Sequence, residues 1–176
     1  MKKIILLLSF LLLFPVSVFA QEYDISFAIG AGNRNAKVGV LGARKYFKPL
    51  FERGSFSAVP SFGFYGTYID VKPSEYSGDT WVLNASGGLT FHFDREKKNA
   101  FFSVFFGPSY ISDKVVGGRE LGSHFQFGTT FSLGTKFGGG RRHSIEAFLM
   151  HYSHAKLADK DNDGYNIYGG AYRYYF

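Results

Sequence analysis

The sequence contains no cysteine, and after residue 20 it contains no long apolar run. Without cysteine, the chain holds no disulfide framework. A helix that spans a bilayer needs about 20 consecutive apolar residues, and no stretch after residue 20 approaches that length. Internal repeats and low-complexity segments are also missing. These absences exclude a disulfide-stapled scaffold, a repeat array and a helical membrane protein.

Residues 1–20 have the features of a signal peptide. Two lysines follow the first methionine, residues 4–14 are apolar, and a small-x-small pattern ends at Ala20. Cleavage after Ala20 would leave residues 21–176, a length that fits one domain. The predicted organisation is therefore an exported chain with a single domain.

The charge is modestly basic, with 20 lysines and arginines against 14 acidic residues. Removal of the signal peptide takes away two lysines and lowers the formal net charge from +6 to +4. A basic surface suits anionic lipid headgroups and nucleic acid equally well. Because the chain is exported, we expect membrane lipid as its partner and no nucleic acid.

Aromatic residues make up 19% of the chain and glycine contributes 22 residues. Large and small or polar residues alternate with period two in eight segments, which predicts eight β-strands. The segments are 22–32, 36–47, 55–70, 80–93, 100–112, 122–137, 143–154 and 164–176. An exported, aromatic-rich chain of this pattern is typical of an all-β protein, an eight-stranded antiparallel transmembrane outer-membrane β-barrel.

A soluble β-sandwich would also alternate, so the alternation alone leaves both folds open. Three features favour the barrel. Segments of ten or more residues match a tilted strand that crosses a bilayer. Aromatic residues gather at the segment ends, as in the interfacial girdles of such barrels. The chain ends in Tyr172–Phe176, similar to the last strand by which outer-membrane proteins are recognised for assembly.

An even number of strands places both ends of the chain on the periplasmic side. Connections near 48–54, 94–99 and 138–142 are then periplasmic turns, and those near 33–35, 71–79, 113–121 and 155–163 are external loops. Side chains fill the interior of an eight-stranded barrel, so we expect no diffusion pore.

Parity predicts a polar cluster on the lipid-facing side of the external rim. If the terminal Phe176 points outward, Asn166 points outward too, because ten residues separate them along one strand. His151 and Ser153 share a face with Ile145 in the neighbouring segment. A polar side chain that faces lipid costs free energy, so we expect this cluster to have a functional role.

Serine and histidine in this arrangement can perform nucleophilic catalysis. A serine hydroxyl is a weak nucleophile until a base such as histidine takes its proton. Ser153 and His151 are two residues apart on one strand, with Cα atoms about 6.5 Å apart. Asn166 is placed to orient the imidazole. The alternative is that these are simply interfacial polar residues where the strands leave the membrane.

The segment His151-Tyr152-Ser153-His154-Ala155, followed by Asn162-Asp163-Gly164 before the last strand, resembles the PagL family of lipid A 3-O-deacylases. The resemblance implies an eight-stranded outer-membrane barrel that hydrolyses the ester-linked acyl chain at the 3-position of lipid A. It implies His151 as general base and Ser153 as nucleophile. Two positions depart from the family pattern: His154 replaces an asparagine that is a candidate oxyanion donor, and Asn166 replaces the carboxylate of the triad.

The loop before the last segment resembles the start of a calcium loop, with Asp159, Asp161 and Asp163 as oxygen ligands. Position twelve of that pattern should be glutamate and is Gly170, so a solvated acidic turn is the alternative. Elsewhere, Glu146 and Arg44 are predicted to pair inside the barrel.

The sequence thus favours an outer-membrane esterase in a Gram-negative bacterium that deacylates lipid A, with lipopolysaccharide as substrate and no cofactor. Ser153 would attack, His151 would carry the proton, Asn166 would hold His151, and His154 or a backbone amide would stabilise the oxyanion. The rival hypothesis is a small non-enzymatic barrel for adhesion, binding or envelope integrity.

Overall fold

Long antiparallel strands form most of the structure, a computed structural model that describes residues 22–71, 78–93, 99–154 and 164–176. The predicted signal peptide, residues 1–20, lies outside these residues. The long strands are β1 (Glu22–Gly32), β2 (Ala36–Tyr46), β4 (Phe56–Val71), β5 (Gly78–His92), β6 (Ala100–Ile111), β9 (Phe125–Phe137), β10 (His143–Ser153) and β11 (Tyr165–Tyr175). No helix among the described residues is long and apolar enough to cross a membrane.

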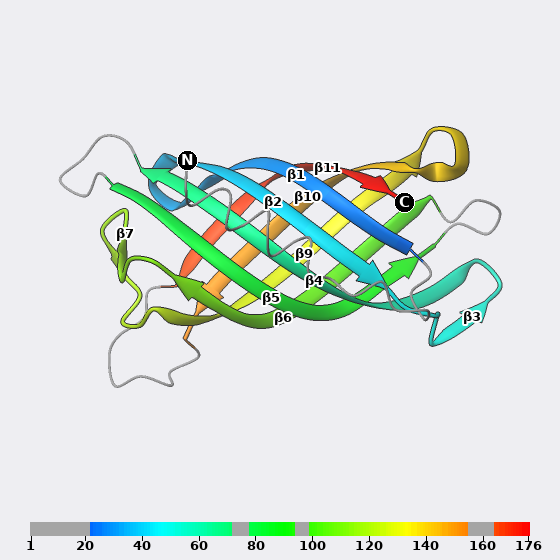
Figure 1. Ribbon diagram of the computed structural model, residues 1–176, viewed down its shortest axis with the longest axis horizontal. Helices are drawn as coiled ribbons and strands as arrows, with labels where there is room; N and C mark the ends of the chain where they lie inside the picture. The colour runs from blue at the N-terminus through cyan, green and yellow to red at the C-terminus, as the bar shows by residue number, and fades with distance from the viewer. Residues whose placement is uncertain (1–21, 72–77, 94–98, 155–163) are drawn as a thin grey trace.

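The long strands close into a barrel. Each pairs with its neighbour along the chain, β1 pairs with β11, and all the pairings are antiparallel. Figure 1 shows the red β11 between the blue β1 and the orange β10. Asp24 of β1 lies opposite Tyr175 of β11, so the start of the first strand and the end of the last lie at one end of the barrel. The fold class and the eight predicted segments are confirmed.

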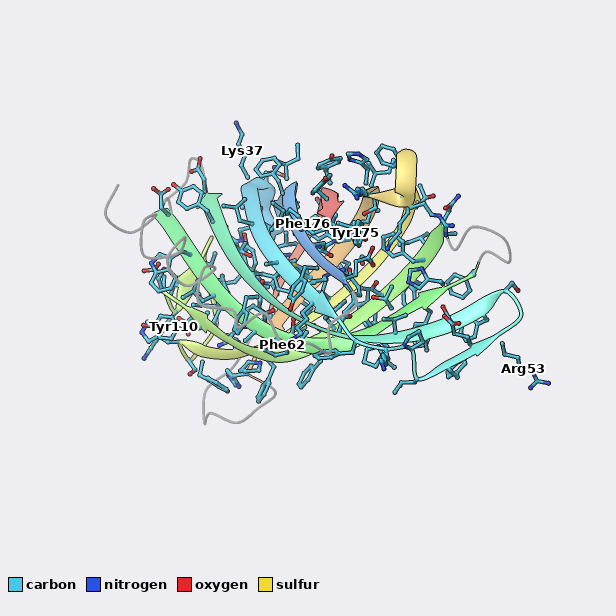
Figure 2. All side chains as sticks on the ribbon, turned by 45° about the vertical axis from the view of Figure 1, so that its right-hand side comes forward. Lys37, Arg53, Phe62, Tyr110, Tyr175 and Phe176 are labelled. Atoms are coloured by element: carbon cyan, nitrogen blue, oxygen red, sulfur yellow. The ribbon has the colours of Figure 1, made fainter. Side chains whose placement is uncertain are left out.

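The two faces of the wall differ as the alternation predicts. Bulky apolar side chains cover the outside, and Phe62 projects from it in Figure 2. Ile29 and Leu133, both outward-facing, are each 63% exposed, which suits a surface covered by lipid. Residues of the opposite parity, such as Ser103, Ser132 and Ser144, are buried in the interior.

Charged residues form a compact cluster in the interior, near the end where β1 starts and β11 ends. Arg173 pairs with Asp24 at 2.9 Å and also with Glu146. Arg44 lies 4.0 Å from Glu146, which confirms the predicted pair across the interior. Each positive group has a negative neighbour, as buried charges require.

Two of the connections contain short strands where turns or loops are predicted. The predicted periplasmic turn at 48–54 includes β3 (Phe51–Arg53), which pairs with β4 and extends the sheet beyond the barrel. At the opposite end, β7 (Val115–Val116) and β8 (Arg119–Glu120) form a hairpin. Figure 1 shows β3 and β7 at opposite ends.

The β7–β8 hairpin packs into the barrel mouth. Val116 is 1% exposed and Leu121 is fully buried, so burial of apolar side chains orders a segment predicted to be a loop. Gly117 and Gly118 make its turn with positive φ angles of 58° and 74°. A shorter turn, η1 (Asn33–Asn35), joins β1 to β2, and η2 (Gly139–Arg141) joins β9 to β10.

Candidate active site

The three predicted catalytic residues lie together at one rim of the outer face. His151 lies directly opposite Asn166 in the pairing of β10 with β11. Asn166 is exposed, and His151 and Ser153 are partly exposed, whereas their neighbours Met150 and Tyr152 are buried in the interior. The structure therefore has all three on the outward face that parity predicts for them.

The side chains of His151 and Asn166 form a hydrogen bond. Nδ1 of His151 lies 2.7 Å from Oδ1 of Asn166. A carbonyl oxygen only accepts hydrogen bonds, so Nδ1 must carry the hydrogen and donate it. The other ring nitrogen, Nε2, then holds a free lone pair, which is the form that a general base needs.

Ser153 lies two residues further along β10 than His151, on the same face and closer to the rim. Its register partner on β9 is Phe127, and the partner of His151 there is Thr129. The sequence interpretation did not include Thr129, although it has the same outward parity and lies beside the imidazole. Three adjacent strands therefore contribute polar side chains to one small area of an otherwise apolar surface.

His154 does not share this surface. Its side chain is 2% exposed, and among the described residues neither ring nitrogen has a hydrogen-bond partner. An oxyanion donor must face the substrate, so this burial argues against the role considered for His154. The other donor considered, a backbone amide, stays a prediction.

Residues outside β10 complete the surroundings of His151. Gly164, with φ of +61°, lies against the imidazole: a Cβ atom at Gly164 would be 2.8 Å from Cε1 of His151. Asn33 accepts a hydrogen bond from the backbone of Asn166, and Arg119 donates one to the carbonyl of Gly164. Sequence reasoning missed all of these contacts, because they join loops that are far apart in the chain.

The remaining site predicted from the sequence is the calcium loop. The calcium-loop residues Asp159, Asp161 and Asp163 lie outside the described residues, so calcium binding stays a prediction. Across the described ranges, no three histidine or acidic side chains are grouped to hold a metal ion. His143 lies at the start of β10, far along the strand from His151, and its Nδ1 is 2.6 Å from the Tyr172 hydroxyl.

A shallow groove lies on the wall between β9 and β10, with a volume of about 280 Å³. Leu133, Ile145 and Ala147 are among its lining residues. These three residues share the outward parity of His151, and the groove is therefore on the lipid-facing side of the barrel. Its lining offers apolar surface on the face that carries the polar cluster.

An eight-stranded barrel with an apolar exterior, an ion-paired interior and a histidine–asparagine pair facing lipid defines a small outer-membrane protein with the features of a hydrolase. The family model for "Lipid A 3-O-deacylase (PagL)" matches residues 40–175. The chain belongs to this family.

Individual relatives agree with the family match. The chain is 26% identical over 154 residues to the lipid A deacylase PagL of Pseudomonas aeruginosa, covering 88% of this chain and 87% of that protein. A crystal structure of the outer-membrane enzyme PagL superposes with a TM-score of 0.75 at 23% identity, covering 86% of this chain and 98% of the other. Neisserial surface protein A shares the fold more distantly, with a TM-score of 0.51 at 13% identity, covering 88% and 95%.

Proposed function

We propose that this outer-membrane protein hydrolyses the ester that links an acyl chain to the 3-position of lipid A. Family membership supports the reaction and the substrate. The apolar exterior of the barrel supports the location, because the lipid-facing wall lies where an outer-leaflet lipid can reach it. Residues 1–20 would act as the signal peptide that exports the chain.

In the first half of the reaction, the Ser153 oxygen attacks the ester carbonyl carbon while Nε2 of His151 takes the hydroxyl proton. The tetrahedral intermediate carries its negative charge on the former carbonyl oxygen, and a backbone N–H near Ser153 would donate to it. As the intermediate collapses, the sugar oxygen leaves with the proton from His151. An acyl group then remains on Ser153.

In the second half, water attacks the acyl carbon and His151 takes one of its protons. The serine oxygen leaves, recovers that proton from His151, and a free fatty acid is released. Asn166 holds Nδ1–H throughout, which keeps Nε2 directed toward the reacting groups. Since an amide is uncharged, it orients the imidazole but stabilises the imidazolium less than a carboxylate does.

The observation that carries the proposal is the pair of His151 and Asn166 on the lipid-facing side, next to an outward-facing serine. Polar side chains on this face lose hydration when lipid covers them, and they point away from the interior ion pairs that could compensate for the loss. A catalytic role on a lipid substrate accounts for their position. The substrate then never has to leave the membrane.

Mass spectrometry of lipid A tests the proposal. Cells of a Gram-negative host would express the wild-type chain, Ser153→Ala or a matched control, Ser144→Ala, whose hydroxyl is buried in the interior. We expect lipid A that lacks one 3-hydroxyacyl chain from the wild type and from the control, and unmodified lipid A from Ser153→Ala. Unmodified lipid A in all three, with each protein folded in the outer membrane, would favour the non-enzymatic barrel.

A further inference from the structure

We propose that Asn33 and Arg119 are positioning residues that hold the segment Gly164–Asn166 against His151 from two external connections. The inference rests on the proposed function, because it assigns residues to the same site. Neither residue belongs to the strand that carries the nucleophile. Asn33 lies in η1 and Arg119 begins β8.

The side chain of Asn33 replaces a backbone hydrogen bond at the end of the β1–β11 pairing. The pairing of β1 with β11 ends where Gly32 lies opposite Ile167. One residue further on, the backbone N–H of Asn166 donates to Oδ1 of Asn33 at 2.6 Å. The side-chain oxygen thus accepts the hydrogen bond that a backbone carbonyl of β1 would accept if the strand continued. This bond fixes the backbone of the residue that orients His151.

A second hydrogen bond holds Asn33 itself. Its backbone carbonyl accepts from the Tyr165 hydroxyl at 3.2 Å, and Tyr165 is 1% exposed. The first bond comes from a backbone N–H in the plane of the sheet, and the second comes from the hydroxyl of a buried side chain. Asn33 is therefore held to β11 by two separate contacts.

Arg119 acts on the other end of the segment. Its Nε donates to the carbonyl of Gly164 at 2.9 Å. Gly164 adopts a left-handed conformation, and the position where a Cβ would lie is 2.8 Å from Cε1 and 3.4 Å from Nε2 of His151. The Gly164 backbone is thus packed against the edge of the ring that must receive the proton. A contact that fixes Gly164 also limits rotation of the imidazole.

Such indirect contacts matter because proton transfer depends on geometry. A misplacement of about 1 Å can lower a rate by about 100-fold. Asn166 holds the imidazole through one neutral hydrogen bond, which depends on direction more than the attraction of a full charge does. The supports of Asn166 and Gly164 therefore determine how well that bond is maintained.

Nitrogen NMR of the histidine rings tests the Asn33 contact without reference to activity. The folded full-length mature chain in detergent micelles would be compared with Asn33→Ala, and His151→Ala would identify the signals of residue 151. We expect the wild-type ring to carry hydrogen on Nδ1, and Asn33→Ala to shift it toward a mixture of the two tautomers. An unchanged tautomer in Asn33→Ala would overturn the inference for Asn33.

Kinetics with purified lipopolysaccharide supply the second readout. Asn33→Ala should lower kcat about tenfold, with KM within about twofold of the wild type. Asn33→Asp keeps an oxygen acceptor and should restore most of the rate. Asn35→Gly is the matched control in the same turn, because Asn35 is exposed and has a positive φ of 59° that glycine accepts. It should behave like the wild type.

A double-mutant cycle shows whether Asn33 acts through Asn166. In an Asn166→Ala background, Asn33→Ala should add less than about a twofold loss, since coupled residues are not additive. A tenfold loss from Asn33→Ala in both the wild-type and the Asn166→Ala background would contradict a role through Asn166. Arg119→Met should also lower kcat more than it raises KM. If Ser153→Ala retains full activity, the proposed function fails, whereas normal rates in both positioning variants would defeat this inference alone.

Discussion

The interior charge cluster and the outer-face site are both polar, but they are built in opposite ways. In the interior, Arg173 lies within 2.9 Å of Asp24 and also pairs with Glu146, and all three are at most 5% exposed. On the outer face, His151 and Asn166 form a neutral pair that remains accessible. In the interior cluster, opposite charges neutralise each other, whereas on the outer face Nε2 of His151 is left to accept a proton.

This contrast separates polar groups with a structural role from those that we expect to act in catalysis. Buried charges in this barrel are neutralised by partners on neighbouring strands, and that arrangement accounts for them structurally. Among the described residues, the lipid-facing His151 has its orienting partner on Nδ1, and the mechanism assigns the proton to Nε2. Interior substitutions should therefore change stability and leave catalysis intact, whereas outer-face substitutions should do the reverse.

The largest expected effect is that of His151→Ala on catalysis. Loss of the general base should lower kcat by about 10²–10⁴-fold, since that is what a positioned acid–base group contributes. The urea midpoint of unfolding should change little, because His151 is partly exposed. Release of fatty acid from lipopolysaccharide and urea unfolding measure the two quantities. A variant with wild-type kcat would remove the distinction between the two regions.

The reverse effect is expected for Arg173→Met. Among the described residues, the cluster would keep the carboxylates of Asp24 and Glu146 with the single positive charge of Arg44 beside them. A buried charge without its partner costs about 3–5 kcal/mol, which should appear as a lower urea midpoint. Arg173→Met combined with Asp24→Asn removes one charge of each sign and should recover part of that loss. Folded protein of either variant should keep the wild-type kcat.

Gly164→Ala should have an intermediate effect. Alanine at φ of +61° is strained, and its Cβ would press on Cε1 of His151 at 2.8 Å. We expect kcat to fall by about 10–100-fold as the imidazole is displaced. Gly54→Ala is the matched control, because Gly54 also has φ of +61° but its Cβ would meet nothing within 4 Å. Equal losses in the two variants would show that the contact with His151 is irrelevant.

The smallest effect is expected for Asn166→Asp, and it should be a gain. A carboxylate binds the imidazolium more strongly than an amide does, so kcat at high pH should rise by about tenfold. Release of fatty acid from lipopolysaccharide, measured for the variant and the wild type across a range of pH, checks this gain. A decrease in kcat at every pH would contradict this prediction.

Much of the barrel could be predicted because the alternation has a direct physical cause. Successive side chains of a strand point to opposite faces, so residues such as Phe131 and Ser132 report their environments from sequence alone. The same rule placed His151, Ser153 and Asn166 on one face. It also places His154 on the inward face with Met150 and Tyr152, and the burial of His154 continues that alternation. The oxyanion role considered for His154 came from the family resemblance and not from parity.

The loops were less predictable for a different reason. The β7–β8 hairpin is ordered by apolar side chains such as Val116 that insert into the barrel mouth. Whether such a mouth exists depends on closure of the whole sheet. In the sequence, Asn33 is simply a polar residue at the end of a strand. Its partner Asn166 is remote in the chain and lies next to it only in the closed barrel.

The sequence by itself determined the strands, the face that each side chain takes and the three residues of the candidate site, because these follow from the two-residue period of an extended backbone. Only the tertiary structure decided how the site is supported. Closure of the barrel brings β1 beside β11 and aligns Asn33 with Asn166. Contacts between residues so distant in the chain depend on strand register and loop packing, which no local pattern encodes.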